Sequence, residues 1–212
     1  MTKNDLDRYS LFLFNHENKC KFEMPNPLKE FMSFLKSNGS SGVIDFSFTS
    51  GLSSLHPTKS LKDNFILDSI PSSLIKNNDD NFEALIKTIK NETLVELVNS
   101  LKPFDKVPEL YSEKEISIAS MVKSLLSKSR YIFIDDTQLK LDHDALEIIK
   151  NCLQIEMNNH NRKIFISTNR ATSWLSITSA IVTNTNGRFN LKDIREKENI
   201  YQQRHLDLVK AS

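Results

Sequence analysis

The sequence predicts an α/β fold with a mostly parallel sheet, and two observations support this prediction. Short apolar runs typical of strands alternate along the chain with apolar residues at helical spacing, and this alternation is typical of parallel sheets. Residues 60–102 differ, because they carry helical patterns only. We therefore expect an inserted helical subdomain at residues 59–102 and a core built from residues 1–58 and 103–212.

The expected strands are short apolar runs bounded by polar or turn-forming residues. In chain order they lie at residues 9–14, 20–24, 43–48, 131–134, 163–167 and 180–183. The polar turn 15–19 joins the first two strands, and the last strand leads into a turn that contains Gly187.

The expected helices are recognised by apolar residues at the i, i+3, i+4, i+7 spacing of a one-faced helix. The first follows Asn26, a candidate N-cap, and Pro27, which suits the first helical position. The others are expected at residues 61–67, 81–101, 113–127, 144–158 and 194–209.

Composition restricts the classes of partner. The 212 residues contain 28 Lys plus Arg and 27 Asp plus Glu, so the formal net charge is +1. A nucleic-acid surface normally needs a basic excess, so no nucleic-acid partner is expected. No apolar run approaches the roughly 20 residues that span a bilayer, and no secretory signal follows the N-terminal charges. Cys20 and Cys152 form no C-x-x-C pair, which fits a reducing, cytoplasmic compartment.

The clearest motif is the apolar run 131–134 followed by two carboxylates, Asp135 and Asp136. It resembles the Walker B motif of ABC-type ATPases, in which the strand ends in Asp-Glu-Pro-Thr-Ser-Ala-Leu-Asp. Here residues 135–142 read Asp-Asp-Thr-Gln-Leu-Lys-Leu-Asp. The resemblance implies that Asp135 stands where the family orients Mg²⁺, Asp136 where it has its catalytic Glu, and Asp142 where it has the Asp of its D-loop.

Other segments resemble the same family in the same order. The signature Leu-Ser-Gly-Gly-Glu falls on Tyr-Ser-Glu-Lys-Glu at residues 111–115, which places Ser112 and Glu115 at nucleotide-binding positions. Asn169 takes the place of the switch His, and Gly51 that of the Q-loop Gln. The resemblance covers roughly residues 51–189 and implies a P-loop-NTPase-like ABC ATPase core. The alternative is an unrelated α/β protein with an acidic strand end.

The residues that would hold nucleotide phosphates have decayed. The pattern G-x-x-x-x-G-K-[ST] is absent, and residues 24–32, at its expected place, contain no glycine. Lys29 is the candidate phosphate lysine there, although we favour a solvated lysine in the first turn of a helix. Both signature glycines are replaced, by Glu113 and Lys114. Ser112 followed by Glu115 is also the pattern of a capping box that opens a helix.

These losses favour a non-hydrolysing, structural or regulatory subunit of a membrane ABC transporter-like complex, with no cofactor. The resemblance implies a cytoplasmic location, peripheral to the inner membrane through partners. Those partners would be an integral-membrane permease and an ABC-type ATPase subunit, either an intact one or a second copy of this chain. Leu55, Leu61 and Phe65 are the candidate partner-binding residues, because they lie where the family receives the coupling helix of the permease. Leu55 precedes Pro57 in an expected loop, so of the three it is the one that we expect to lie outside the core.

Two alternatives stay open. The first is a divergent but active ATPase that binds Mg-ATP through Lys29, Asp135 and Asp136, in which Asp135 would be the one metal-binding residue. The second is a soluble adaptor with an ABC-like fold and no membrane link. The five histidines are scattered, and their spacing suggests no protein-held metal site.

Overall fold

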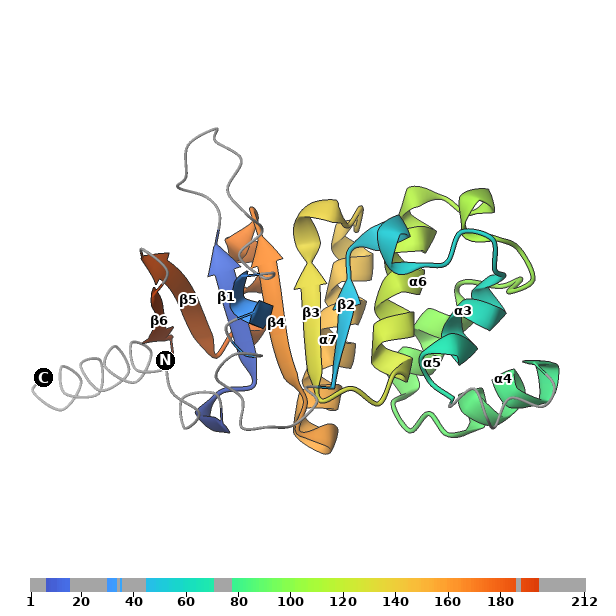
Figure 1. Cartoon of the computed structure of the whole chain (residues 1–212), viewed down its shortest axis with the longest axis horizontal. Coiled ribbons are helices and arrows are strands. Elements are labelled where there is room, and N and C mark those ends of the chain that lie inside the picture. The colour runs from blue at the N-terminus through green and yellow to red at the C-terminus, as the bar shows by residue number, and fades with distance from the viewer. Residues whose placement is uncertain are drawn as a thin grey trace, which may run out of the picture.

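Six strands form one sheet in the computed structural model, which describes residues 7–15, 30–33, 35, 45–70, 78–185 and 188–194. The strand order is β2-β3-β4-β1-β5-β6 (Figure 1). The first five strands run parallel, and β6 pairs antiparallel with β5. The strand bounds are Leu11–Asn15 (β1), Phe46–Thr49 (β2), Tyr131–Asp135 (β3), Lys163–Thr168 (β4), Ala180–Thr185 (β5) and Arg188–Asp193 (β6). The prediction of an α/β fold with a mostly parallel sheet is confirmed.

The helices connect these strands and extend beyond the β2 edge of the sheet. The α-helices are α3 (Leu61–Leu67), α4 (Asn78–Lys87), α5 (Glu92–Asn99), α6 (Glu113–Leu126) and α7 (His143–His160). Short 3₁₀ helices are η1 (Gly51–Ser54), η3 (Pro108–Leu110), η4 (Asp136–Gln138) and η5 (Ala171–Ile177). None of the helices in the described part of the chain is long and apolar enough to cross a membrane.

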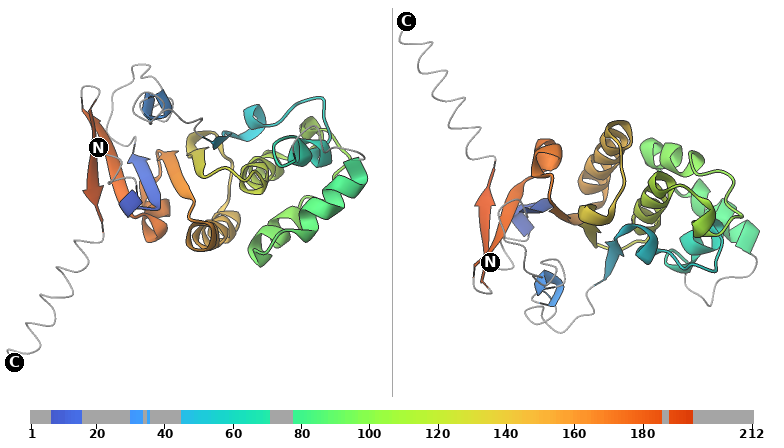
Figure 2. Two further views of the ribbon diagram at one scale, coloured as in Figure 1. Left: turned by 60° about the horizontal axis from the view of Figure 1, so that its bottom comes forward. Right: turned by 90° about the horizontal axis from the view of Figure 1, so that it is seen from above.

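The two faces of the sheet carry different side chains. Leucine and isoleucine alternate with phenylalanine along β1, β3 and β4, and successive residues of a strand point to opposite faces. The aliphatic residues, such as Leu13 and Ile166, pack in one cluster with α6 and α7. The phenylalanines pack on the other face, so the two cores are separated by the sheet. Figure 2 shows α6 and α7 on one side and the helical turn at residues 30–35 on the other.

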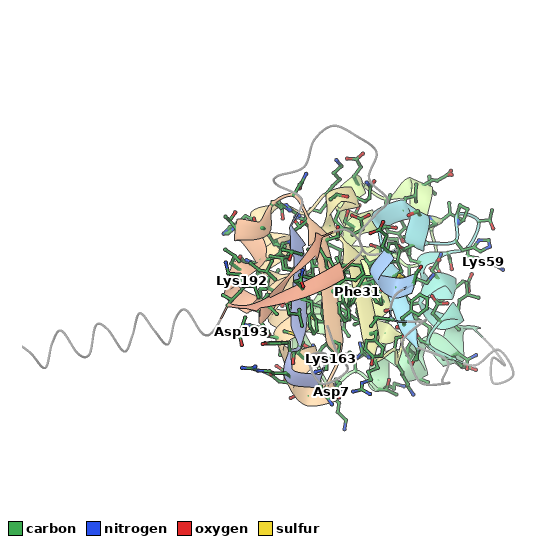
Figure 3. All side chains as sticks on the ribbon, turned by 60° about the vertical axis from the view of Figure 1, so that its left-hand side comes forward. Asp7, Phe31, Lys59, Lys163, Lys192 and Asp193 are labelled. Carbon is green, nitrogen blue, oxygen red and sulfur yellow. The ribbon has the colours of Figure 1, made fainter. Side chains whose placement is uncertain are left out.

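The phenylalanine face is organised as a stack across three strands. Phe12 of β1 stacks on Phe165 of β4 with ring centroids 4.7 Å apart, and Phe133 of β3 stacks on the same ring at 4.8 Å. Phe31 covers them from residues 30–33, with its centroid 5.2 Å from that of Phe165 (Figure 3). Aromatic pairs at these distances stabilise a fold beyond the apolar area that they bury.

The helices α3 to α5 occupy the segment expected to form the inserted subdomain, and Figure 1 shows them beside α6 at one end of the sheet. Their apolar side chains, including Phe65 and Leu97, belong to the same cluster as the aliphatic face of the sheet. The single helix expected at residues 81–101 is in fact two helices. Asn91 separates them, because its side chain accepts a hydrogen bond from the Leu94 N–H and so opens α5.

Several expectations fall on residues that the structure does not describe. These are the strand at residues 20–24, Cys20, and the C-terminal helix beyond Ile194. The strand expected at residues 43–48 is observed as β2, from Phe46 to Thr49.

Candidate functional site

The topology identifies one edge of the sheet as the place for a site. The chain leaves β1 toward β2 on one side and leaves β4 toward β5 on the other side of β1. In open α/β sheets, ligands bind outside the carboxyl ends of the strands where the connections diverge in this way. The carboxyl ends of β3 and β4 bring the Walker B-like carboxylates and the switch-His position to this edge.

Asp136 lies at this edge and is fully engaged by its own chain. Its side chain is 0% exposed. The Oδ2 atom accepts hydrogen bonds from Thr168 Oγ1 at 2.6 Å, Arg170 Nε at 2.9 Å and Trp174 Nε1 at 3.0 Å. The Oδ1 atom accepts from Arg170 Nη2 at 2.7 Å. Three of these four bonds converge on Oδ2, so donors of the same chain hold the carboxylate in a fixed orientation.

The three donors come from the end of β4 and the turn that follows it. Thr168 is the last residue of β4, Arg170 follows two residues later, and Trp174 lies in η5. Arg170 also donates from Nη1 to the carbonyl oxygen of Leu141 at 3.2 Å. Its hydrogen bond with Asp136 raises the pKa of Arg170, so the guanidinium stays charged. The network therefore ties the segments after β3 and β4 together.

Asp135 has a different role. Its Oδ1 accepts two hydrogen bonds from Thr137, one from the backbone N–H at 3.3 Å and one from the hydroxyl at 2.6 Å. Asp135 is thereby the N-cap of η4. Asn169, at the switch-His position, is exposed, and its neighbours Thr168 and Arg170 are the residues that reach Asp136.

The signature-like residues form a helix cap. Ser112 is the N-cap of α6, and its hydroxyl accepts a hydrogen bond from the Glu115 N–H. In return, the Glu115 carboxylate accepts hydrogen bonds from the Ser112 N–H at 2.8 Å and from the Ser112 hydroxyl at 2.7 Å. These bonds lower the pKa of Glu115. The capping-box interpretation of these two residues is confirmed.

Asp142 also caps a helix, since it accepts from the Ala145 N–H at 3.0 Å at the start of α7. It pairs with Lys114 at 2.5 Å, and this hydrogen bond lowers the pKa of Asp142. The pair connects the start of α7 to the start of α6. The structure thus brings Ser112, Glu115 and Asp142 to neighbouring helix ends, where each works as a cap.

Gly51, at the Q-loop position, has a backbone role. Its φ is +64°, in the left-handed region that favours glycine. A Cβ there would lie 3.1 Å from the carbonyl oxygen of Gln138. The absence of a side chain lets η1 lie close against the turn after β3.

The expectation that Leu55 lies outside the core is wrong. Leu55, Leu61 and Phe65 are only 5%, 1% and 0% exposed, and all three belong to the aliphatic core. The Asn64 side chain explains why the loop is buried, because it accepts from the His56 N–H at 2.6 Å and donates to the His56 carbonyl at 3.1 Å. In the same part of the chain, Leu52 of η1 is 46% exposed.

Lys29 lies outside the described residues. Of residues 24–32, the expected place of the phosphate loop, residues 24–29 are not described.

The described candidate residues at this edge are engaged within the chain. Asp136 accepts four hydrogen bonds and its side chain is 0% exposed, and Ser112 and Glu115 hydrogen-bond to each other. Arg170 and Trp174 were not identified from the sequence as partners of Asp136. No local pattern marks them, since they lie 34 and 38 residues further along the chain.

No protein-family profile and no curated protein matches the sequence. Solved structures do match the fold. An inward-facing ABC transporter assigned to the metal-chelate type matches with a TM-score of 0.60 and 12% identity, over 88% of this chain and 73% of that chain. An ATP-binding subunit of an ABC transporter matches with a TM-score of 0.61 and 14% identity, over 91% of this chain and 82% of that chain.

A third match is a dimeric ATP-binding cassette in a post-hydrolysis state, bound to ADP and Pi. Its TM-score is 0.61 at 12% identity, over 89% of this chain and 86% of that chain. At such low identities the likeness shows the fold alone. The mostly parallel sheet and these structural matches together show that the chain has the fold of the ATP-binding subunits of ABC transporters.

Proposed function

We propose that this chain is a non-hydrolysing, structural or regulatory subunit of an ABC transporter-like complex. The observation that supports this most directly is the buried, hydrogen-bonded carboxylate of Asp136. A general base must come within hydrogen-bond reach of the proton that it removes. The side chain of Asp136 is 0% exposed and accepts four hydrogen bonds from donors of the same chain, so it is shielded from solvent.

The start of α6 also disfavours a phosphate. Glu113 and Glu115 place two carboxylates in its first turn, and Lys114 is engaged by Asp142. A carboxylate about 4 Å from a phosphate charge costs about 4 kcal/mol at an effective dielectric constant near 20. The proposal therefore includes no nucleotide and no metal as a resident cofactor.

The proposed work of the subunit is docking. A permease would bind near η1, on the segment after β2, and would hold the chain at the cytoplasmic face of the membrane. Leu52 is the exposed apolar side chain of η1, and it replaces the buried Leu55 as the residue to test. The second partner would be an ABC-type ATPase subunit, intact or a second copy of this chain.

Mg-ATP titration tests the loss of nucleotide chemistry. We expect isothermal titration of the full chain to show no binding with a dissociation constant below about 1 mM, or about 4 kcal/mol. A melting temperature that is unchanged by Mg-ATP would agree, because a ligand that binds only the native state raises it. Tight binding together with hydrolysis would instead support the divergent active ATPase.

A matched pair of surface variants tests the docking. Leu52→Asp and Leu175→Asp each place a charge on an exposed leucine, 46% and 41% exposed. Leu52 lies in η1, which packs on α6, whereas Leu175 lies in η5, which packs on β1 and α7. We expect Leu52→Asp alone to lose the membrane proteins that co-purify with the wild type from detergent extracts. If the wild type brings down no membrane protein, the soluble adaptor becomes the better account.

A further inference from the structure

A pocket of about 640 Å³ lies at the opposite edge of the sheet from Asp136. Its lining includes Arg130 and Arg162, which directly precede β3 and β4, so it lies at the amino ends of these strands. Its other walls come from the end of α4, the start of α5 and the C-terminal ends of α6 and α7. Pockets for small molecules usually enclose roughly 300–1,000 Å³. The volume suits a ligand of that size.

The lining has an apolar part and a cationic part. The apolar part contains four leucines that are each 6% exposed or less: Leu85, Leu94, Leu125 and Leu126. The cationic part contains Lys90, Lys128 and Arg130, which are all exposed. The formal net charge of the whole chain is only +1, so this is a local concentration of positive charge.

The carboxylate in the lining does not neutralise these cations, because it is engaged elsewhere. Glu156 is 3% exposed, pairs with Arg162 at 3.3 Å and accepts from Asn91 Nδ2 at 3.0 Å. Arg130 makes a looser contact with Asp7 at 3.5 Å, and both side chains are more than half exposed. Lys90 and Lys128 have no ion-pair partner among the described residues.

Helix capping does not account for the cations either. Basic residues often lie beside helix C-termini, where they satisfy free carbonyl groups. At the end of α6 that role is filled by Arg162, which donates to the carbonyl oxygens of Leu125 at 2.7 Å and Ser127 at 2.9 Å. Lys128 lies beyond this cap. Its charge is therefore available to a ligand.

We propose that this pocket binds a small amphipathic anion, with a carboxylate or phosphate head on Lys90, Lys128 and Arg130 and an aliphatic body on the four leucines. A hydrocarbon chain that enters the pocket is itself removed from water, and the exposed cations supply charge-assisted hydrogen bonds to the head. A free fatty-acid-like ligand and an anionic lipid headgroup share this chemistry. The site is independent of the proposed docking function and of the carboxyl edge of the sheet.

The soluble arm of the test is isothermal titration of the full chain with decanoate and with decyl phosphate, each below its micelle concentration. Inorganic phosphate tests the anionic head without a hydrocarbon chain, and decanol tests the hydrocarbon chain without an anionic head. The charge-reversal variant is Lys90→Glu with Lys128→Glu, and both positions are exposed, so the fold should persist. The matched control is Lys140→Glu with Lys192→Glu, which makes the same charge change at exposed lysines outside the pocket (Figure 3 labels Lys192).

We expect the amphipathic anions to bind, the pocket variant to weaken binding at least tenfold and the control variant to change it less than twofold. Decanol binding as tightly as decanoate, equal losses in both variants, or no binding of any probe would overturn the proposal. The second arm uses vesicles of phosphatidylglycerol and of phosphatidylcholine. Binding to the anionic vesicles that the pocket variant abolishes would assign the head to a membrane lipid, and vesicle binding that survives in that variant would contradict the site.

Discussion

The carboxylate of Asp136 is buried and held by three other side chains, so its replacement reports on structure more than on catalysis. In Asp136→Asn the amide N–H₂ would face a donor of Arg170 in either orientation, because Arg170 donates to both oxygens of the carboxylate. Breaking one partner of a buried ion pair costs about 3 kcal/mol or more. We expect that loss in urea unfolding, followed through the fluorescence of Trp174, the only tryptophan.

Asp105→Asn is the control for this variant. Asp105 also pairs with a cation, Lys62, but its side chain is 79% exposed. Exposed pairs contribute about 0–1 kcal/mol, so the control should unfold close to the wild type. An Asp136→Asn protein of normal stability with a reduced ATPase rate would contradict the structural role.

Arg170→Lys separates charge from geometry at the same site. Lysine keeps the positive charge but cannot reproduce the two-point contact that Arg170 makes with both oxygens of Asp136. A hydrogen bond to a charged group contributes about 1.5–3 kcal/mol, so we expect a loss of about 2 kcal/mol in the same unfolding assay. Arg8→Lys, where the side chain is 62% exposed beside Asp193, should change stability very little. Equal stabilities of the two variants would show that the forked geometry is unimportant.

The sequence located this site only in part. Asp135 and Asp136 could be placed at a strand end because the apolar run before them is unambiguous. The donors could not be found, because the pairing of β3 with β4 and the turn at η5 bring Thr168, Arg170 and Trp174 to Asp136. A polar group that is satisfied by residues more than thirty positions away leaves no local pattern.

At the scale of single elements, the capping box of α6 makes stability depend on pH. The folded-state pKa of Glu115 is lowered by the hydrogen bonds from Ser112, relative to its ordinary value of 4.5. A lowered carboxylate pKa adds stability that is present above the unfolded pKa and is lost as pH falls through the folded one. We expect Glu115→Gln to be less stable than the wild type at pH 7, and the gap to close below about pH 4.

The control for this experiment is Glu96→Gln, at an exposed position of α5 with no cap to lose. Urea unfolding at a series of pH values would show a difference in unfolding free energy between the wild type and Glu115→Gln at pH 7, and no such difference for Glu96→Gln. A gap for Glu115→Gln that stays constant from pH 7 to pH 3 would mean that the carboxylate charge does not stabilise the cap.

The elements themselves were largely predictable. Parallel strands are buried on both faces and appear as continuous apolar runs, which is why β3, β4 and β5 were found within a residue or two. The break between α4 and α5 was missed, because Ile89 and the residues around it continue the apolar pattern. Leu55 was misplaced because a loop before proline was expected to be exposed, whereas Asn64 holds that loop against the core.

At the scale of the whole molecule, the aliphatic core runs without a break from the sheet into α3, α4 and α5. Leu55→Asp would bury an unpaired carboxylate in it, a change that is costly. We expect this variant to lose several kcal/mol of stability, on the order of 3–5, or to fail to fold. Leu52→Asp, three residues earlier but exposed, should fold like the wild type by circular dichroism. A stable Leu55→Asp protein would show that η1 and α3 can detach from the sheet.

The central position of the first strand has a consequence for how the protein is made. Leu11 of β1 pairs with Ile164, and Phe12 pairs with Ala180, so both neighbours of β1 are translated long after it. At about 5–20 residues per second, a ribosome needs roughly ten to thirty seconds to bridge that interval. Throughout it, the nascent chain carries Phe12 and Phe14 without the strands that flank them in the sheet. The sheet can therefore close around β1 only after β4 and β5 have been synthesised, and until then Phe12 cannot stack on Phe165.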